Sequence, residues 1–235
     1  MPIKEPVLPS IIFTVTNDLL YDQRMIRICT SLSENGYQIT LVGRKLPGSG
    51  QLPAKPFKQK RLWCFFKKGK LFYAEFNTRL FFFLLFQKMD VVCAIDLDTI
   101  IPCYYISKIK NAKRVYDAHE YFSQQKEVLS RPYIYRCWHW IEKKFIPLFP
   151  NGYTVSFSIA RAFNEQYGAN FEVFRNLPVL KEFQIQPASH PGNKIILYQG
   201  AVNESRGLEY LVPAMKDIDA ELHIYGDGNF MAQVK

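Results

Sequence analysis

The N-terminal part of the chain alternates short apolar segments with amphipathic ones, and this alternation restricts the fold more than any other feature. Residues 11–15 form an apolar run of the length of a buried strand. Asp22 then opens a segment whose apolar residues recur at helical spacing until Asn35 and Gly36, which favour a helix end. Residues 38–42 form a second apolar run. A strand, a helix and a strand within about 30 residues predict the βαβ unit of a parallel sheet.

The same alternation continues to about residue 175. Further strands are predicted at residues 62–66, 91–95, 114–116, 153–156 and 171–174, and further helices at residues 71–88, 99–110, 133–145 and 158–167. Strands separated by helices in this way predict a doubly wound α/β domain with a Rossmann-like parallel sheet. We place this domain at residues 1–178.

A second series of elements follows a polar linker at residues 179–193, which contains Pro187 and the pair Pro191-Gly192. Strands are predicted at residues 194–198 and 220–225, with a helix at residues 207–215 between them. One βαβ unit leaves its apolar strands without neighbours to cover them. We therefore expect residues 194–235 to be the beginning of a second, truncated Rossmann-like domain.

Charge is distributed unevenly along the chain. The whole sequence carries a net charge of +9, while residues 23–89 contain 13 Lys and Arg against two acids, Glu34 and Glu75. The net positive charge of this segment is thus larger than that of the whole chain. It predicts an anionic partner on one side of the molecule, either a nucleic acid or the headgroups of a membrane.

Cysteine usage favours a reducing compartment. The five cysteines are odd in number and widely spaced, without a CxxC pair or a Cys/His cluster of zinc-binding spacing. The first apolar run is too short for the core of a signal peptide. Free thiols and a cytoplasmic location are the expectation.

Polar residues follow most of the predicted strands, at the edge where open parallel sheets bind ligands. They are Thr16, Asn17, Asp18, Asp22, Gln23, Arg24, Asp96, Asp98, Asp117, His119, Glu120, Ser156, Ser158, Arg175 and Asn176. Taken singly, Asp22, Asp98 and Ser158 are each better explained as helix N-caps. Their accumulation at one edge favours a binding site.

The segment Asp117-Ala-His119-Glu120 is the most specific of these. An imidazole at the end of a strand can donate to a sugar hydroxyl or stabilise a developing charge. The alternative is that His119 pairs with Asp117 and only fixes the loop. Asp96 and Asp98 could hold a divalent metal bridged to a diphosphate, but a helix follows at once, so a strand end and a cap are favoured and no metal site is predicted.

Taken in order, these loops resemble landmarks of the family 4 retaining glycosyltransferases of the GT-B fold. The segments are TNDLLYDQRMIRICTSLSENGYQITLVGR, VYDAHEYF, GYTVSFSIARAF, VFRNLP, ILYQGAVNESRGLEYLVPAM and IYGDGN. The resemblance implies two facing Rossmann-like domains, the first binding the acceptor and the second a nucleoside-diphosphate sugar, with no metal or other cofactor.

The resemblance also implies roles for individual residues. It places Asp22 and Arg24, with Asn17, Asp18, Asp117 and Glu120, in acceptor-side loops. His119 falls at the position that reaches the donor sugar, and Gly200 with Arg206 and Gly207 at the donor diphosphate. A glycine loop before a helix, with an arginine, suits a phosphate, although an ordinary turn with a surface arginine is the alternative.

The sequence departs from the family pattern at three places. Asn17-Asp18 and Ala201 replace residues that are commonly glycines and an arginine, respectively. The family's pair of donor-side glutamates would lie beyond Lys235. Since family 4 enzymes are usually drawn with front-face substitution, in which the departing diphosphate takes the acceptor proton, no protein nucleophile is expected.

A basic aromatic stretch covers residues 55–88. Its second half places Phe72, Phe76, Leu80, Phe83 and Leu84 on one helical stripe, interrupted by charged residues too often to span a bilayer. Either this helix is buried in the first domain, or the stretch rests on an anionic membrane. Nucleic acid ranks below both, because no recognition motif accompanies the charge.

The sequence therefore predicts a glycosyltransferase that transfers a sugar, with retention, from a nucleotide-sugar donor to a saccharide or lipid-linked acceptor. Polysaccharide or glycolipid assembly at the cell surface is the expected process, in the cytoplasm or peripherally on the inner face of the cytoplasmic membrane. With a truncated donor domain we expect this chain to be inactive alone. The alternatives are a non-catalytic acceptor- or membrane-binding module and a GT-B-like sugar-nucleotide epimerase.

Overall fold

The computed structural model describes residues 8–178, 180, 194–204 and 206–234. The chain divides into two compact units, Met1–Pro178 and Val179–Lys235. The predicted linker at residues 179–193 lies outside the described residues, apart from residue 180.

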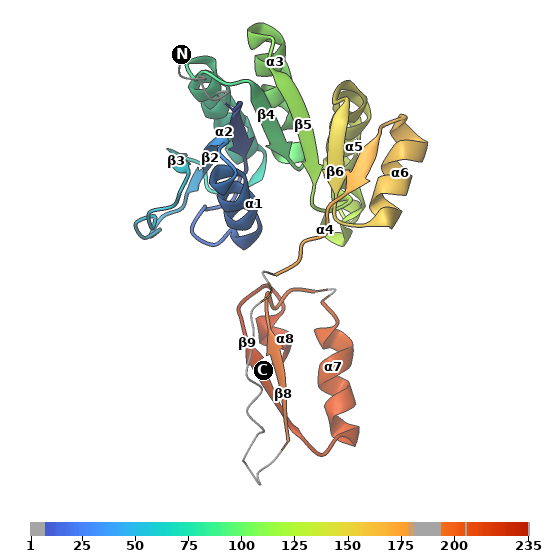
Figure 1. The fold of residues 1–235 in the computed structure, drawn as a ribbon. Helices are drawn as coiled ribbons and strands as arrows, with labels where there is room; N and C mark the ends of the chain where they lie inside the picture. Colours follow the sequence, from blue (N-terminus) through green and yellow to red (C-terminus); the bar gives the residue numbers. More distant parts are fainter. Residues whose placement is uncertain (1–7, 179, 181–193, 205, 235) are drawn as a thin grey trace. The chain divides into compact units, whose positions relative to one another are not determined.

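The first unit is built on a sheet of seven strands in the order β3-β2-β1-β4-β5-β6-β7, and all neighbouring strands are parallel (Figure 1). The strands are β1 (Ser10–Thr14), β2 (Gln38–Lys45), β3 (Lys58–Trp63), β4 (Val91–Ile95), β5 (Lys113–Ala118), β6 (Asn151–Thr154) and β7 (Phe171–Val173). The direction of winding reverses between β1 and β4. Loops leaving these two strands therefore diverge and leave a crevice in which such sheets bind ligands.

Helices cover the two faces of the sheet unequally. They are α1 (Gln23–Glu34), α2 (Gly69–Leu85), α3 (Ile100–Lys110), α4 (Lys126–Leu129), α5 (Pro132–Phe145) and α6 (Phe157–Tyr167), with short 3-10 turns at Leu97–Thr99, Phe122–Gln124 and Ile146–Leu148. Apolar residues of α2, α3, α5 and α6 form one buried cluster with one face of the strands. The other face packs against α1, through Met25 and Cys29.

Helix α2 belongs to the core of the first unit. Phe72, Phe76, Leu80 and Leu84 are at most 4% exposed and pack in the larger cluster. This settles the two interpretations of the helical stripe in favour of a buried helix. Within the described part of the chain, no helix combines the length and apolar character needed to cross a bilayer.

Three local predictions need correction. Strand β3 spans Lys58–Trp63 and not residues 62–66, so the aromatic residues after Trp63 lie in a loop. Asp98 does not cap α3, whose N-cap position is occupied by Thr99. Helix α6 begins earlier than expected, and its cap is Ser156, whose hydroxyl accepts the Ile159 N–H at 3.3 Å. The predicted cap at Asp22 is confirmed, since its carboxylate accepts the Met25 N–H at 3.1 Å.

The second unit contains a parallel pair of strands and a helix. Its elements are β8 (Ile195–Gln199), α7 (Leu208–Ala214), a 3-10 turn at Met215–Asp217, β9 (Glu221–Tyr225) and α8 (Met231–Val234). The loops that leave the two strands are in tight contact, because a Cβ at Gly226 would lie 1.8 Å from the Gly200 carbonyl oxygen. Glycine at position 226 is therefore required for these loops to meet.

Candidate functional site

The loops after β1, β4 and β5 lie together at the carboxyl edge of the sheet, because all three strands are parallel and adjacent. With the start of α1 and the end of β5 they bring Arg24, Asp96, Asp117 and His119 into contact, while the nearby Asp98 carboxylate accepts the Thr16 hydroxyl. This is the edge at which the sequence predicted a binding site, and it coincides with the reversal of winding between β1 and β4.

His119 lies between two carboxylates. Its Nε2 is 3.4 Å from Asp117 Oδ2, and its Nδ1 is 3.7 Å from Asp96 Oδ2. The backbone N–H of His119 donates to Asp96 Oδ1 at 2.9 Å. The imidazole is 19% exposed, so it can meet a ligand while the two acids hold its orientation.

Arg24 and Asp117 form a buried ion pair from α1 to β5. The Arg24 Nη2 donates to Asp117 Oδ1 at 2.9 Å, and the two side chains are 9% and 0% exposed. The guanidinium also lies 6.0 Å from the centre of the Tyr153 ring on β6. Three elements far apart in the sequence are thus tied together beneath the imidazole.

Asp96 adopts a backbone conformation that non-glycine residues rarely occupy, with φ 55° and ψ 178°. Such conformations cost on the order of 1–3 kcal/mol and persist where surrounding contacts enforce them. Here the Asp96 N–H donates to the Asp117 carbonyl at 2.9 Å, while the side chain accepts the His119 N–H. Strained backbone of this kind is characteristic of functional sites. In this conformation the Asp96 carboxylate lies against the loop of His119.

Burial alters the acidity of the cluster. It raises the pKa of Asp117 to about 6, against the opposing pull of the Arg24 charge. Burial also raises the pKa of Asp98 to about 6, against the hydrogen bond from Thr16. The pKa of Asp96 lies well above its ordinary value because of burial and the neighbouring acids, first Asp98. The pKa values of Asp98 and Asp117 thus lie closer to neutral pH than those of ordinary carboxyl groups, as is common at functional sites.

Three buried polar atoms of the cluster have no hydrogen-bond partner within the part of the chain that the structure describes. They are Arg24 Nη1, Asp117 Oδ2 and His119 Nε2. Buried polar atoms are nearly always paired in folded proteins, so an unpaired group needs an explanation. Asp117 Oδ2 and His119 Nε2 lie 3.4 Å apart and face each other, so among the described residues Arg24 Nη1 is the atom of the three that is left for a polar ligand.

The other predicted residues of this edge have contacts within the domain. Asp18 is 4% exposed and accepts hydrogen bonds from Leu20 N, Leu46 N and the Ser49 hydroxyl. Burial raises its pKa, but these hydrogen bonds and Arg61 outweigh burial and lower it overall. Asn17 Nδ2 donates to Asp22 at 3.3 Å.

Glu120 is exposed, and its carboxylate accepts the Gln125 side chain at 2.7 Å. The predicted acceptor-side loop thus contains residues that also hold the loop together, and their part in binding an acceptor stays a prediction.

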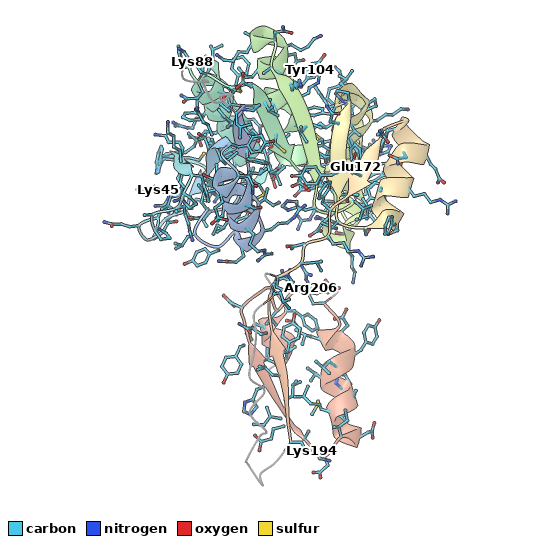
Figure 2. The ribbon with its side chains drawn as sticks, in the orientation of Figure 1. Lys45, Lys88, Tyr104, Glu172, Lys194 and Arg206 are labelled. Carbon is cyan, nitrogen blue, oxygen red and sulfur yellow. The ribbon has the colours of Figure 1, made fainter. Side chains whose placement is uncertain are left out.

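The predicted diphosphate residues lie at the carboxyl edge of the second unit. Figure 2 labels Arg206 at the end of this unit opposite to Lys194, which precedes β8. Arg206 is exposed, and Gly207 takes the N-cap position of α7 with φ 85°. The Gly200 N–H donates to the Tyr225 carbonyl at 3.0 Å, which leaves it less suited to a phosphate than predicted. Their assignment to a donor stays a prediction.

Sequence reasoning missed the part played by Asp96, although it noted the Asp96-x-Asp98 pair. The pair itself was the signal that could have found it. What the sequence does not display is the strained φ and the hydrogen bond to a loop 23 residues away. Among the described residues no group of three or more His, Cys, Asp and Glu has an arrangement suited to a metal ion.

Comparisons with known proteins identify solved structures of similar fold. No protein-family model matches the sequence. No curated protein matches it either. Among solved structures, the apo form of the lipopolysaccharide outer core galactosyltransferase WaaB is 14% identical, with a TM-score of 0.63 over 96% of this chain and 63% of that one.

Two further structures are similar to the same extent. Sucrose-phosphate synthase from Thermosynechococcus elongatus is 14% identical, with a TM-score of 0.65 over 93% of this chain and 62% of that one. Anabaena Alr3699/HepE, in complex with UDP and glucose, is 14% identical, with a TM-score of 0.63 over 96% of this chain and 63% of that one. The chain thus spans under two thirds of the length of these neighbours, and its α/β fold is that of the GT-B glycosyltransferases.

Proposed function

We propose that this chain is part of a glycosyltransferase that moves a sugar from a nucleoside-diphosphate sugar to a saccharide or lipid-linked acceptor. The observation that carries the proposal is the partly exposed His119 held between Asp96 and Asp117 at the reversal of winding in a GT-B type sheet, together with Arg24 Nη1, which has no hydrogen-bond partner among the described residues. Sugars offer hydroxyl groups that can accept hydrogen bonds from an imidazole and a guanidinium. The UDP and glucose in the HepE structure support a nucleotide sugar as the donor.

In this proposal His119 contacts the donor sugar, and Asp96 and Asp117 fix the plane of the imidazole from its two sides. Asp96 acts as a positioning residue, because its carboxylate contacts the His119 backbone. Gly200, Arg206 and Gly207 would take the diphosphate, and the acceptor would lie along Asn17, Asp18, Asp22, Arg24 and Glu120. The reaction would proceed with retention, as in family 4, and without a metal ion or other cofactor.

The proposed process is the assembly of a cell-surface polysaccharide or glycolipid, with the protein in the cytoplasm or at the inner face of the cytoplasmic membrane. A front-face substitution suits this site. The carbon–oxygen bond to the diphosphate breaks as the acceptor oxygen bonds to the same sugar carbon, and the acceptor proton passes to the departing diphosphate. His119, as a hydrogen-bond donor, would then orient the donor sugar rather than attack it.

A binding experiment with the purified chain tests this proposal without requiring turnover. Three pairs of ligands are titrated, each made of a nucleoside diphosphate (UDP, GDP or ADP) and a sugar nucleotide built on it. Each affinity is measured by calorimetry. We expect one pair to bind. For that pair, His119→Ala should weaken the sugar nucleotide about tenfold, as the loss of one hydrogen bond to a buried group predicts, and leave the free diphosphate unchanged.

His139→Ala provides the matched control, because His139 stacks on Tyr135 within α5 and is not among the residues assigned to the site. Equal weakening of sugar nucleotide and diphosphate by His119→Ala would contradict contact with the sugar. Failure of all three pairs to bind would refute the donor assignment and favour a binding module. Interconversion of the bound sugar without acceptor would favour an epimerase.

A further inference from the structure

The connection between β3 and α2 displays aromatic side chains in water. Trp63, Phe65, Phe66 and Leu71 are 56%, 70%, 39% and 53% exposed, respectively. The ring centroids of Trp63 and Phe65 are 6.4 Å apart and those of Phe65 and Phe66 are 5.4 Å apart, both in edge-to-face geometry. The three rings therefore form one group. We call residues 63–71 the tip. Contiguous exposed apolar groups of this kind mark an interaction surface.

Basic side chains accompany the aromatic ones. Lys67, Lys68 and Lys70 are all exposed in the tip. Glu75 is the one acid in the sequence of residues 55–88; it is 14% exposed, and its carboxylate accepts a hydrogen bond from Arg79 Nε at 2.8 Å. The tip thus combines apolar rings with uncompensated positive charge, which is the pattern of a surface that enters an anionic membrane interface.

The tip is held in place by its neighbours. The Glu75 carboxylate accepts the Phe65 and Phe66 backbone N–H groups, each at 2.9 Å, and these hydrogen bonds lower the pKa of Glu75. The Arg44 guanidinium donates to the Lys67 carbonyl at 2.7 Å and lies 4.1 Å from the centre of the Phe72 ring. A fixed backbone loses little conformational freedom on binding, which favours association.

The tip lies at the same edge of the sheet as the candidate site. Strand β3 is parallel to β2, β1, β4 and β5, so the chain leaves β3 at the carboxyl edge, where His119 follows β5. Figure 2 labels Lys45, which ends β2 at this edge, and Lys88, which precedes β4 at the opposite edge. A membrane contacted by the tip would therefore face the edge that carries the site.

We infer that the tip, through Trp63, Phe65, Phe66 and Leu71 with Lys67, Lys68 and Lys70, docks this protein on an anionic lipid bilayer. The rings enter the headgroup region while the ammonium groups meet lipid phosphates. The proposed membrane contact is thus limited to the exposed part of the basic aromatic stretch of residues 55–88, because the apolar stripe on α2 is buried in the core. The consequence for a lipid-linked acceptor rests on the proposed function, whereas docking itself does not.

The experiment measures co-sedimentation of the purified chain with vesicles of phosphatidylcholine alone or with 30% phosphatidylglycerol, a composition chosen for the assay. We expect binding to the anionic vesicles only, and weaker binding as salt rises. Replacing both Phe65 and Phe66 by Ser should lower the partition coefficient about tenfold, since two of the four exposed apolar side chains of the tip are lost. Replacing Lys67, Lys68 and Lys70 by Glu should lower it by a similar or larger factor.

Matched controls come from the opposite edge of the same sheet. Phe82 and Phe86, at the end of α2, are 55% and 79% exposed, and Lys88, Lys108 and Lys113 are exposed near the starts of β4 and β5. The Phe82→Ser/Phe86→Ser variant and the triple Lys→Glu variant at these positions should bind vesicles as the unaltered chain does. All variants are first compared by circular dichroism to verify that they fold.

A second readout places the tip in the bilayer. Brominated lipids quench tryptophan that enters the headgroup region, so quenching should disappear in Trp63→Phe and persist in Trp140→Phe. Binding that ignores lipid charge, or that the two sets of variants weaken equally, would overturn the inference. So would binding of the tip to single-stranded nucleic acid in the absence of vesicle binding. Since no sugar nucleotide is present, these results are independent of the donor-binding test.

Discussion

Replacing Arg24 by Met tests whether the buried ion pair supports the candidate site. Methionine keeps the straight side chain and the helix propensity that α1 needs, but removes the charge. Asp117, fully buried, would lose the guanidinium at 2.9 Å. Removing one partner of a buried pair typically costs about 3–5 kcal/mol, because an uncompensated charge remains inside. We expect a loss of stability in this range at pH 7.5.

The loss should depend on pH in a direction that the structure determines. Burial raises the pKa of Asp117 to about 6 in the folded protein, above its ordinary value of 3.8. The folded state then holds an extra proton between these values, so this carboxyl group makes the protein less stable as pH rises through the window, by about 3 kcal/mol in all. Without Arg24 the folded pKa rises further. The effect of Arg24→Met should therefore be small at pH 4.5 and grow up to pH 7.5 and beyond.

Tryptophan fluorescence during urea unfolding measures this stability selectively, since all three tryptophans, Trp63, Trp138 and Trp140, belong to the first unit. The double variant Arg24→Met/Asp117→Asn removes the acid as well and should recover most of the loss at pH 7.5. Equal losses at pH 4.5 and 7.5, or a double variant no more stable than Arg24→Met, would refute the reasoning. Either result would mean that Arg24 stabilises through packing and not through Asp117.

Two further predictions concern the scaffold. Gly226→Ala should speed amide exchange of Val202 and Tyr225, because the new Cβ would lie 1.8 Å from the Gly200 carbonyl oxygen. Gly50→Ala is the control: its Cβ would meet only one atom, at 4.0 Å, so the exchange of Val202 and Tyr225 should not change. Unchanged exchange in Gly226→Ala would contradict the loop contact. Phe76→Ala should cost about 3–5 kcal/mol in urea unfolding. Phe82→Ala should cost under about 0.5 kcal/mol, because Phe82 is 55% exposed, and similar losses at the two positions would disprove the buried face of α2.

The strands that the sequence predicted best are those buried on both faces. Strand β4 was predicted at residues 91–95 and is found at Val91–Ile95, because a central parallel strand is a continuous apolar run. Strand β3 was predicted four residues too late at its start. It is an edge strand with exposed Lys58 and Lys60, so its pattern is mostly polar, and the apolar run that suggested a strand is the exposed tip.

The site was predictable in its location but not in its contacts. Asp117 and His119 were found because polar residues directly after a strand must lie at the ligand-binding edge of a parallel sheet. The pairing of Arg24 with Asp117 joins residues 93 positions apart, and nothing local in the sequence indicates it. The strained φ of Asp96 is equally hidden, because it depends on contacts from the following strand. Likewise, N-caps were displaced by one or two residues where several candidates were adjacent.

The sheet order sets the distance between the tip and the loop of His119. Strands β3 and β5 are separated by β2, β1 and β4, which makes four strand spacings. At about 4.8 Å for each spacing, the tip and the loop of His119 lie roughly 19 Å apart along the sheet edge. If the tip docks on a bilayer, the loop of His119 faces that bilayer from a point roughly 19 Å along the edge from the docked residues. Under the proposed function, an acceptor carried on a lipid would then need a sugar or another polar group that extends out of the headgroups toward the loop of His119.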